Sequence, residues 1–473
     1  MNDEISDNRL KTFFQKWLAV HREYYLPNLR LCGSSIMKQM GAMPAIFVLY
    51  NEKTDKSKLY GNTSCHSAWA CPKCTAEVMA KKAAQIAAGI DCLKKYHQQS
   101  AIMITFTIPH SANMTCKESF QVLLNTWRQF SKGGNRAAKS TQKYVLKNDK
   151  GVRGKKGGAL GVGKAGEVKT YYKGRDPYGA FRAELGIKHN VRVYEFTHGE
   201  NAWHPHIHAL FWVPDKNFAK ILDYEQELLD GWWHAVKLEA KKFWSKKITD
   251  PKELETFLNT IYADWKKTTA DGHKSLFISK DRDLPNRARR VSSSWYIAGW
   301  GGDAEVTGNY QQKASHGNNL TPYQIIHKAF ESQGEEREKY LHLYAEYAQA
   351  TYRHRRCEFS KSGITKLIAE YLKTNDYKES LKKKSTDKEK DKFWKVVYWF
   401  TAQQWRETLL VQKIKGMYLV DDVLELARAP NPRQLITMFL EKYGIDTTLT
   451  IPNYDIKLVE DTVNRIHDKT YAA

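Results

Sequence analysis

The sequence has no long apolar run and no excess of acidic residues. No stretch approaches the roughly 20 consecutive apolar residues with which a helix spans a bilayer, so we expect no membrane partner. The first residues, MNDEISDNRLKTFF, carry acids where a secretory signal has a basic end and an apolar stretch. The complete phosphate-binding sequence Gly-x-x-x-x-Gly-Lys-Ser/Thr is also missing, which argues against an attached helicase. The sequence therefore predicts a cytoplasmic protein.

The charge balance is strongly basic. Lys and Arg number 75 against 52 Asp and Glu, giving a net charge of +23 and a pI near 9.4. Such an excess favours a polyanionic partner, nucleic acid before an anionic membrane surface. At 473 residues the chain exceeds the usual size of a single core, so two or three domains are expected.

Cysteine is sparse, but four of the seven cysteines occur in a suggestive pattern. In a reducing compartment clustered cysteines are metal ligands before they are disulfides. A Cys-x-x-Cys turn lets two thiolates reach one tetrahedral ion, and SCHSAWACPKC contains that spacing with a third cysteine six residues earlier. We predict a structural Zn²⁺ site made by Cys32, Cys65, Cys71 and Cys74. His66 could replace one of them, and the alternative is that all four are ordinary half-buried cysteines.

The stretch WHPHIHALFWV, residues 203 to 213, places two histidines at the head of an apolar run. Side chains alternate across a strand, so His206 and His208 would share one face with Leu210 and Trp212. The preceding HNVRVYEFTHG is a second strand candidate, and HGENAWHP supplies turn residues. If the strands pair antiparallel about residues 200 and 201, Glu195 falls opposite His206, with Cβ atoms about 4.5–5.5 Å apart.

Two imidazoles and one carboxylate, with positions left open, suit a divalent cation such as Mn²⁺ or Mg²⁺ that must also take a substrate oxygen. We therefore predict a metal site at Glu195, His206 and His208. His198 and His204, which we assign to the turn, are reserve ligands. The alternative is that the histidines are structural.

Other stretches outline the remaining elements. Helical periodicity covers 75–97, 117–131 and 335–357, and AIMITFTIP at 101–109 is a strand ended by proline. Residues 132–182 hold 14 Lys or Arg against three acids, with eleven glycines. This stretch has too little apolar surface to pack, and is either a contact to a phosphate backbone or a solvated insertion.

A candidate nucleophile lies in SSSWYIAGWGGDAEVTG, where Tyr296 follows a basic and aromatic segment. A buried structural tyrosine is the alternative. Trp203, Trp295 and Trp300 could stack on bases, although packing is the more common role of a tryptophan. The candidate DNA contacts are Arg289, Arg290 and Lys313.

The order of these motifs is familiar. The CPKC cluster, MITFTIP, YEFTHGENAWHPHIHALFWV, WYIAGW, EVTGNYQQKASHGNNLTPYQII and YAEYAQATYRHRRCEFSKSG resemble the replication initiators (Rep) of rolling-circle plasmids, which are HUH endonucleases. The resemblance runs from about residue 28 to 365. It implies a nuclease that binds a divalent cation through Glu195, His206 and His208 and attacks DNA with Tyr296.

The implied reaction is transesterification at a replication origin. Tyr296 would displace a 3′ hydroxyl from one DNA strand, leaving a 5′-phosphotyrosyl link that the same site can rejoin. The DNA would be single-stranded or an extruded origin, and the free 3′ end could serve a host polymerase and helicase in a bacterial cytoplasm. The chain departs from the family in having Gly299 where a lysine often follows the tyrosine, and Ser292 where some relatives have a glutamate. Lys280, Arg289 or Arg290 could supply the missing charge.

Two other functions stay open. A transposase with the same chemistry would cut element ends, and a non-catalytic zinc-containing protein would bind DNA without cleaving it.

The expected fold is α+β, with a central antiparallel sheet, flanking helices, a small zinc module and a helical C-terminal region. We divide the chain into 1–95 with the cysteine module, 96–330 as the nuclease domain with the insertion 132–182, a helical extension 331–372, a charged linker 373–393 and a small domain 394–473.

Overall fold

The computed structural model describes residues 7–34, 45–109, 111–131, 177–261, 319–374, 393–448, 456–457 and 459–461, apart from the Ala80 side chain. Of residues 137–145, 152–153, 159–161, 168–175, 262–270 and 276–278 it describes the backbone alone. None of the described helices is long and apolar enough to cross a membrane.

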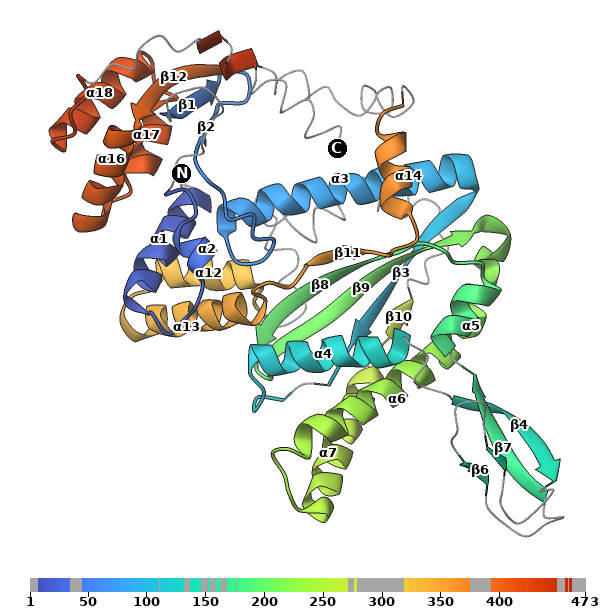
Figure 1. Cartoon of the computed structure of the whole chain (residues 1–473). Helices are drawn as coiled ribbons and strands as arrows, with labels where there is room; N and C mark the ends of the chain where they lie inside the picture. Colours follow the sequence, from blue (N-terminus) through green and yellow to red (C-terminus); the bar gives the residue numbers. More distant parts are fainter. Residues whose placement is uncertain are drawn as a thin grey trace.

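A five-stranded antiparallel sheet forms the centre of the molecule (Figure 1). Its strands, in spatial order, are β10 (Leu276–Ile278), β3 (Gln99–Thr107), β9 (Ala202–Pro214), β8 (Asn190–Gly199) and β11 (Cys357–Phe359). Helices flank the sheet, so the predicted α+β class with a central antiparallel sheet is confirmed.

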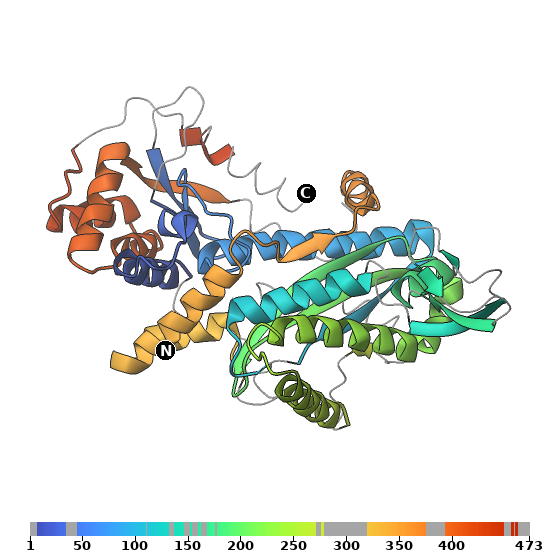
Figure 2. The same ribbon diagram turned by 60° about the horizontal axis from the view of Figure 1, so that its bottom comes forward.

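Helices cover both faces of this sheet (Figures 1 and 2). On one face α4 (Cys116–Ser131), α5 (Pro177–Glu184) and α6 (Glu225–Trp244) pack against Ile207, Ala209, Phe211 and Val213 of β9. On the other, α3 (Pro72–His97) and α14 (Ile364–Tyr371) pack against Leu210 and Trp212. The alternation predicted for this strand is confirmed. Because both faces are buried, its second half is continuously apolar, and each large side chain there stabilises the fold by about 1.5–3 kcal/mol.

A second sheet joins the two ends of the chain. Its order is β12-β1-β2, with β1 (Ala45–Asn51), β2 (Lys56–Tyr60) and β12 (Trp394–Thr401). Helices α16 (Ala402–Ile414), α17 (Leu419–Leu426) and α18 (Pro432–Lys442) complete this unit. β1 pairs antiparallel with β12, from Ala45 opposite Thr401 to Asn51 opposite Trp394. Residues that the sequence analysis assigned to the N-terminal region thus share a sheet and a core with the predicted 394–473 domain.

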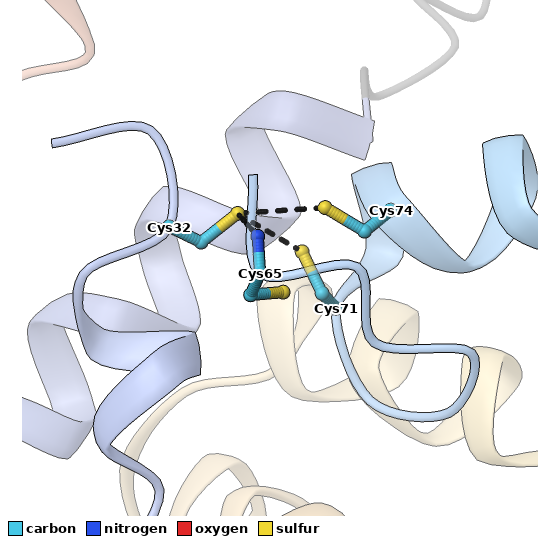
Figure 3. A group of neighbouring side chains, drawn as sticks. All are labelled: Cys32, Cys65, Cys71 and Cys74. Atoms are coloured by element: carbon cyan, nitrogen blue, oxygen red, sulfur yellow. Dashed lines mark hydrogen bonds between the residues drawn. The ribbon is translucent and has the colours of Figure 1, made fainter. Parts of the chain in front are cut away.

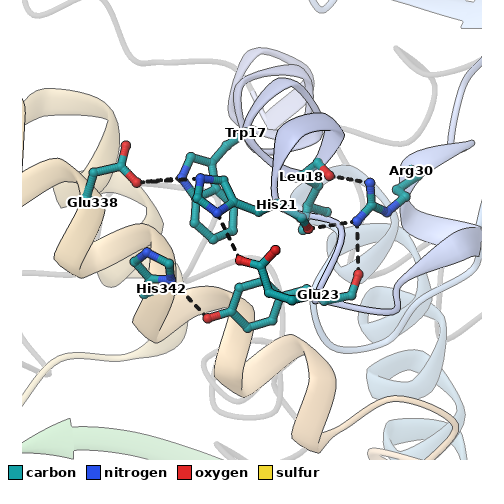
Figure 4. A network of polar contacts seen from close by, with 8 residues as sticks. Trp17, Leu18, His21, Glu23, Arg30, Glu338 and His342 are labelled. Carbon is teal, nitrogen blue, oxygen red and sulfur yellow. Dashed lines mark hydrogen bonds and ion pairs between the residues drawn. The ribbon is translucent and has the colours of Figure 1, made fainter.

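The N-terminal helices α1 (Asp7–Val20) and α2 (Pro27–Arg30) lie near α12 (Pro322–Glu331) and α13 (Gly334–Ala350). Figure 4 shows the contact between α1 and α13: Trp17 stacks on His21, and its Nε1 donates to Glu338 Oε2 at 2.8 Å. The Arg30 guanidinium donates to the backbone carbonyls of Leu18, His21 and Tyr24. These bonds close the turn that leads into Cys32.

The helices predicted for 75–97 and 117–131 and the strand predicted for 101–109 occur where expected. Two other predictions are corrected. The helix predicted for 335–357 ends at Ala350; Arg353 adopts a left-handed backbone with φ of 64°, and residues 357–359 form β11. Residues 177–182, predicted to be unable to pack, begin α5 and bury Pro177, Tyr178 and Phe181. Within the same stretch β4 (Ala137–Val145) pairs with β7 (Val168–Arg175), and β5 (Val152–Arg153) with β6 (Ala159–Gly161). The remaining elements are η1 (Asp215–Tyr224) and α7 (Pro251–Ala270).

Candidate functional site

The hairpin of β8 and β9 has the predicted register. Gly199 lies opposite Ala202 across the two-residue turn, and Glu195 lies opposite His206. His208 is opposite Val193 on β8 and opposite Thr105 on β3, the other neighbour of β9. Three ligand-bearing residues are therefore on one face of adjacent strands.

The side chains of this group converge on one point. Oε2 of Glu195 lies 2.8 Å from Nε2 of His208 and 3.2 Å from Nε2 of His206. The ligand atoms of all three lie within 4.8 Å of one another. Their side chains are only 10–14% exposed, so water screens the carboxylate poorly.

These distances fit a shared cation. Ligand atoms about 2.0–2.2 Å from a metal, at right angles to one another, are about 3 Å apart. The two separations of 2.8 and 3.2 Å between Glu195 Oε2 and the histidine nitrogens agree with this spacing. The Glu195, His206 and His208 group could therefore hold a metal ion on one side and leave the other side of the ion open.

A hydroxyl orients one of the imidazoles. Thr105 Oγ1 lies 2.9 Å from Nδ1 of His208. With Nε2 as the metal ligand, Nδ1 carries the proton and donates it to this oxygen, which fixes the tautomer and the ring plane. Nδ1 of His206 is buried and has no hydrogen-bond partner among the described residues.

The reserve ligands lie in the strands rather than in the turn, contrary to the prediction. His198 belongs to β8, and its backbone pairs with Leu320 while its ring packs on Trp203. His204 belongs to β9, and its ring centre is 5.6 Å from that of His206. The turn is shorter than expected because the strands pair up to Gly199 and Ala202.

The four predicted cysteines form a second group (Figure 3). Sγ of Cys32 lies 3.7 Å from Sγ of Cys71 and 3.5 Å from Sγ of Cys74, and all four sulfurs are within 4.8 Å of one another. With Zn–S bonds of about 2.3 Å, tetrahedral geometry puts sulfurs about 3.8 Å apart, so the group could bind a metal ion such as zinc. His66 is exposed and outside this group.

Local structure explains how the thiols meet. Cys71 is the residue before α3 and Cys74 lies in its first turn, which gives the Cys-x-x-Cys spacing. Cys32 follows α2, and Gln15 of α1 fixes this segment by donating to the carbonyls of Leu29, Arg30 and Cys32. The cluster thus ties the N-terminal helices to the start of α3.

Charge around the cluster favours a bound cation. Hydrogen bonds from the other three thiols lower the pKa of Cys32, and hydrogen bonding to Cys32 raises the pKa of Cys65 and Cys71. The hydrogen bond with Cys32 raises the pKa of Cys74, but those with Cys65 and Cys71 outweigh it and lower this pKa to about 6. The thiols alone therefore favour thiolates at Cys32 and Cys74, and ionising Cys65 and Cys71 as well needs a cation. The other cysteines, predicted to be packing residues, are buried: Cys92, Cys116 and Cys357.

A buried lysine lies beside the cluster. Lys11 is 6% exposed, and a Cβ built on Gly33, next to Cys32, would lie 2.9 Å from its Nζ. Burial and then the charge of Lys73 lower the pKa of Lys11, whereas the charges of Cys71 and Cys32 raise it. Its ammonium can offset the negative charge of a metal held by four thiolates.

The predicted nucleophile and DNA contacts lie outside the described residues: Tyr296, Arg289, Arg290 and Lys313, together with Lys280, Trp295 and Trp300. Described residues on both sides of this segment lie at the sheet, with Ile278 opposite Ile104 and Leu320 bridged to His198. Trp203 is 2% exposed and donates to Glu346, so it packs in the core and is not available for stacking on bases.

Sequence reasoning missed Thr105 and Lys11. Thr105 had a signal, because Met103, Thr105 and Thr107 alternate on one face of β3 and become polar at the level of the histidines. Lys11 had none, since a single lysine in a basic chain does not reveal that its ammonium is buried.

Comparison with known proteins does not assign a family. No family model matches the chain, and no solved structure matches it. A neomycin resistance protein from Streptomyces cyanogenus is 26% identical over 156 residues, which are 32% of this chain and 31% of that protein. The chain therefore spans about a third of the length of the curated relative that it matches. Similarity of this extent does not show a shared activity.

Proposed function

We propose that the protein is a replication initiator of the HUH type, which nicks one DNA strand at an origin by metal-dependent tyrosine transesterification. The observation that carries the proposal is the convergence of Glu195, His206 and His208 on one point of the central sheet. The net charge of +23 and the motif order support a DNA substrate.

The residues divide the chemistry between them. A divalent cation such as Mn²⁺ or Mg²⁺, held by Glu195, His206 and His208, would polarise the scissile phosphate. The Tyr296 oxygen would form a bond to phosphorus as the bond to the 3′ oxygen breaks, while the phenol's proton passes to a base and the 3′ oxygen takes up a proton to become the 3′ hydroxyl. Because an ordinary tyrosine has a pKa of about 10, this attack needs a nearby cation or base. The four cysteines would hold a structural Zn²⁺ that fixes the N-terminal helices on α3.

The test is a covalent adduct. The protein is incubated with single-stranded origin DNA after chelation and re-addition of Mn²⁺ or Mg²⁺, and denaturing gels detect protein joined to DNA. We expect an adduct in the wild type and its loss in Tyr296→Phe and His206→Ala. Matched controls are Tyr96→Phe and His97→Ala, whose side chains are exposed at the end of α3.

Each result separates the candidates. An adduct that survives Tyr296→Phe would place the nucleophile elsewhere. Adducts formed on element ends but not on origins would indicate a transposase with the same chemistry. Binding without any adduct would leave a non-catalytic DNA-binding protein.

A further inference from the structure

A pocket of about 570 Å³ opens beside the cysteine cluster. Its wall comes from the loop Cys65–Ala70, from α3, and from the segment between α13 and β11. This volume is in the range of small-molecule and nucleotide sites, about 300–1,000 Å³. None of Glu195, His206 and His208 lines the pocket, and Cys65 is the one cysteine of the cluster in its wall.

The wall of this pocket is cationic. Lys82, Arg353 and Arg355 line it, and the two arginines are exposed. Glu358 is the one carboxylate among the described residues of the wall, and it is already paired with Arg192. An anion entering the pocket therefore meets uncompensated positive charge.

Aromatic rings alternate with these cations. The Arg353 guanidinium lies 5.2 Å from the ring centre of Tyr352, and Lys82 Nζ lies 5.6 Å from that of Phe359. Tyr25, which is 65% exposed, packs edge-on against Tyr352 and precedes Leu26, and both of these neighbours line the pocket. Cations beside exposed rings are what a nucleotide needs, since phosphate binds the cation and the base stacks on the ring.

Backbone strain marks the same place. Arg353 and His66 both have positive φ, 64° and 49°, although neither is glycine, and both line the pocket. Such conformations cost free energy and tend to collect at binding sites, where the surrounding structure holds them. Arg356, in the same segment as Arg353, is buried: its guanidinium donates to the carbonyl of Ala68 and lies over the ring of Trp69.

The pocket also lies close to the metal-binding group. β11, which forms part of its wall, pairs with β8, and the amide of Tyr194 donates to the carbonyl of Arg356 at 3.0 Å. Tyr194 is the residue before Glu195. A strand of DNA held in the pocket is therefore one β-strand away from the carboxylate of the metal-binding group.

We propose that this pocket binds one nucleotide of the single DNA strand whose neighbouring phosphate lies at the Glu195, His206 and His208 group. Arg353 and Arg355 contact phosphate, and Tyr25 with Tyr352 stacks on the base. The proposal rests on the proposed function for the role of the strand, but binding is measured without cleavage.

The test is fluorescence anisotropy of a short labelled oligothymidylate, without divalent metal, on the His206→Ala/His208→Ala background. We expect Arg353→Gln/Arg355→Gln to weaken binding at least about tenfold and to reduce its salt dependence. The matched control, Arg406→Gln/Arg433→Gln, removes the same charge from exposed sites on α16 and α18 and should change affinity less than about twofold. Equal losses in the two double variants would overturn the proposal, because they would show an effect of net charge alone.

A second arm tests the base. An abasic strand with the same phosphates should bind the wild-type protein more weakly than oligothymidylate, and Tyr25→Ala should abolish this difference while Tyr25→Phe keeps it. Free thymidine monophosphate should compete only weakly if the pocket is a subsite for a strand. Equal binding of abasic and normal strands, or strong competition by the free nucleotide, would overturn the subsite.

The two proposals fail separately. Loss of binding in the pocket variants without any adduct in the wild type would support the pocket and contradict nicking. A normal adduct with unchanged strand affinity in the pocket variants would support nicking and contradict the pocket.

Discussion

Thr105 is the residue that most directly controls the geometry of His208. Its hydroxyl oxygen lies 2.9 Å from Nδ1 of His208. Valine has nearly the same shape as threonine and lacks this hydroxyl. We expect Thr105→Val to weaken Mn²⁺ binding about tenfold or more, because the ring loses the partner that fixes its tautomer. Titration calorimetry measures this, with Thr256→Val on the exposed helix α7 as the control. Unchanged affinity would show that packing alone orients the ring.

Lys11 has a corresponding role at the cysteine cluster. Four thiolates around Zn²⁺ carry a net double negative charge, and the buried ammonium lies beside Cys32 and Cys71. We expect Lys11→Met to lower zinc affinity about tenfold, measured by competition with a chromogenic chelator. Lys16→Met is the control, because Lys16 on the same helix bonds the carbonyl of Met417. Equal zinc affinity in the two variants would argue against charge compensation.

At the scale of elements, one carboxylate joins α13, α4 and β9. Glu346 accepts from the first amide of α4, Cys116, at 2.6 Å and from Nε1 of Trp203 at 3.0 Å. We expect Glu346→Gln to destabilise the sheet region by about 1–3 kcal/mol, since the amide leaves one of these donors unpaired and loses the favourable charge at the helix N-terminus. Thermal unfolding measures the loss, and Glu331→Gln, at the exposed C-terminal end of α12, should not destabilise the protein.

The sequence could predict the elements that are made by local signals. The β8–β9 hairpin combines strict alternation with a short turn, so its register and the meeting of Glu195 with His206 follow from period two alone. The end of α13 had no such signal. Tyr340, Tyr344 and Tyr347 lie at helical spacing, but pairing of Cys357 with Val193 of β8 takes the chain out of the helix. Tertiary pairing sets this end of the helix, and the partner strand β8 lies far outside the local stretch of sequence from which a helix is predicted.

At the scale of the whole molecule, the pairing of β1 with β12 could not be predicted from the sequence for the same reason. Ala45 and Thr401 are neighbours in space although the sheet of β8, β9 and β3 lies between them in sequence. Two short strands separated in this way leave no periodic trace of their pairing. The chain ends are held together further by α1, where Asn8 donates to Asp421 at 3.1 Å and Lys16 lies over the ring of Tyr418.

This arrangement decides how the C-terminal region can be separated from the rest. Ile46 and Val48 of β1 are fully buried in one core with Phe400, Trp405 and helices α16–α18. Removing β1 exposes this core and the edge of β12, and each large side chain lost from the core costs about 1.5–3 kcal/mol.

We therefore expect residues 394–473 expressed alone to show no cooperative unfolding by circular dichroism, whereas the same segment fused through a flexible linker to residues 45–60 folds. A fusion that carries 45–60 in scrambled order is the control for length and composition. Cooperative melting of 394–473 alone would mean that β12 and the three helices suffice. Recovery by the native order but not by the scrambled one would instead show that the first strands of the chain complete the last domain, so that the C-terminal unit can form only in a chain that also supplies its beginning.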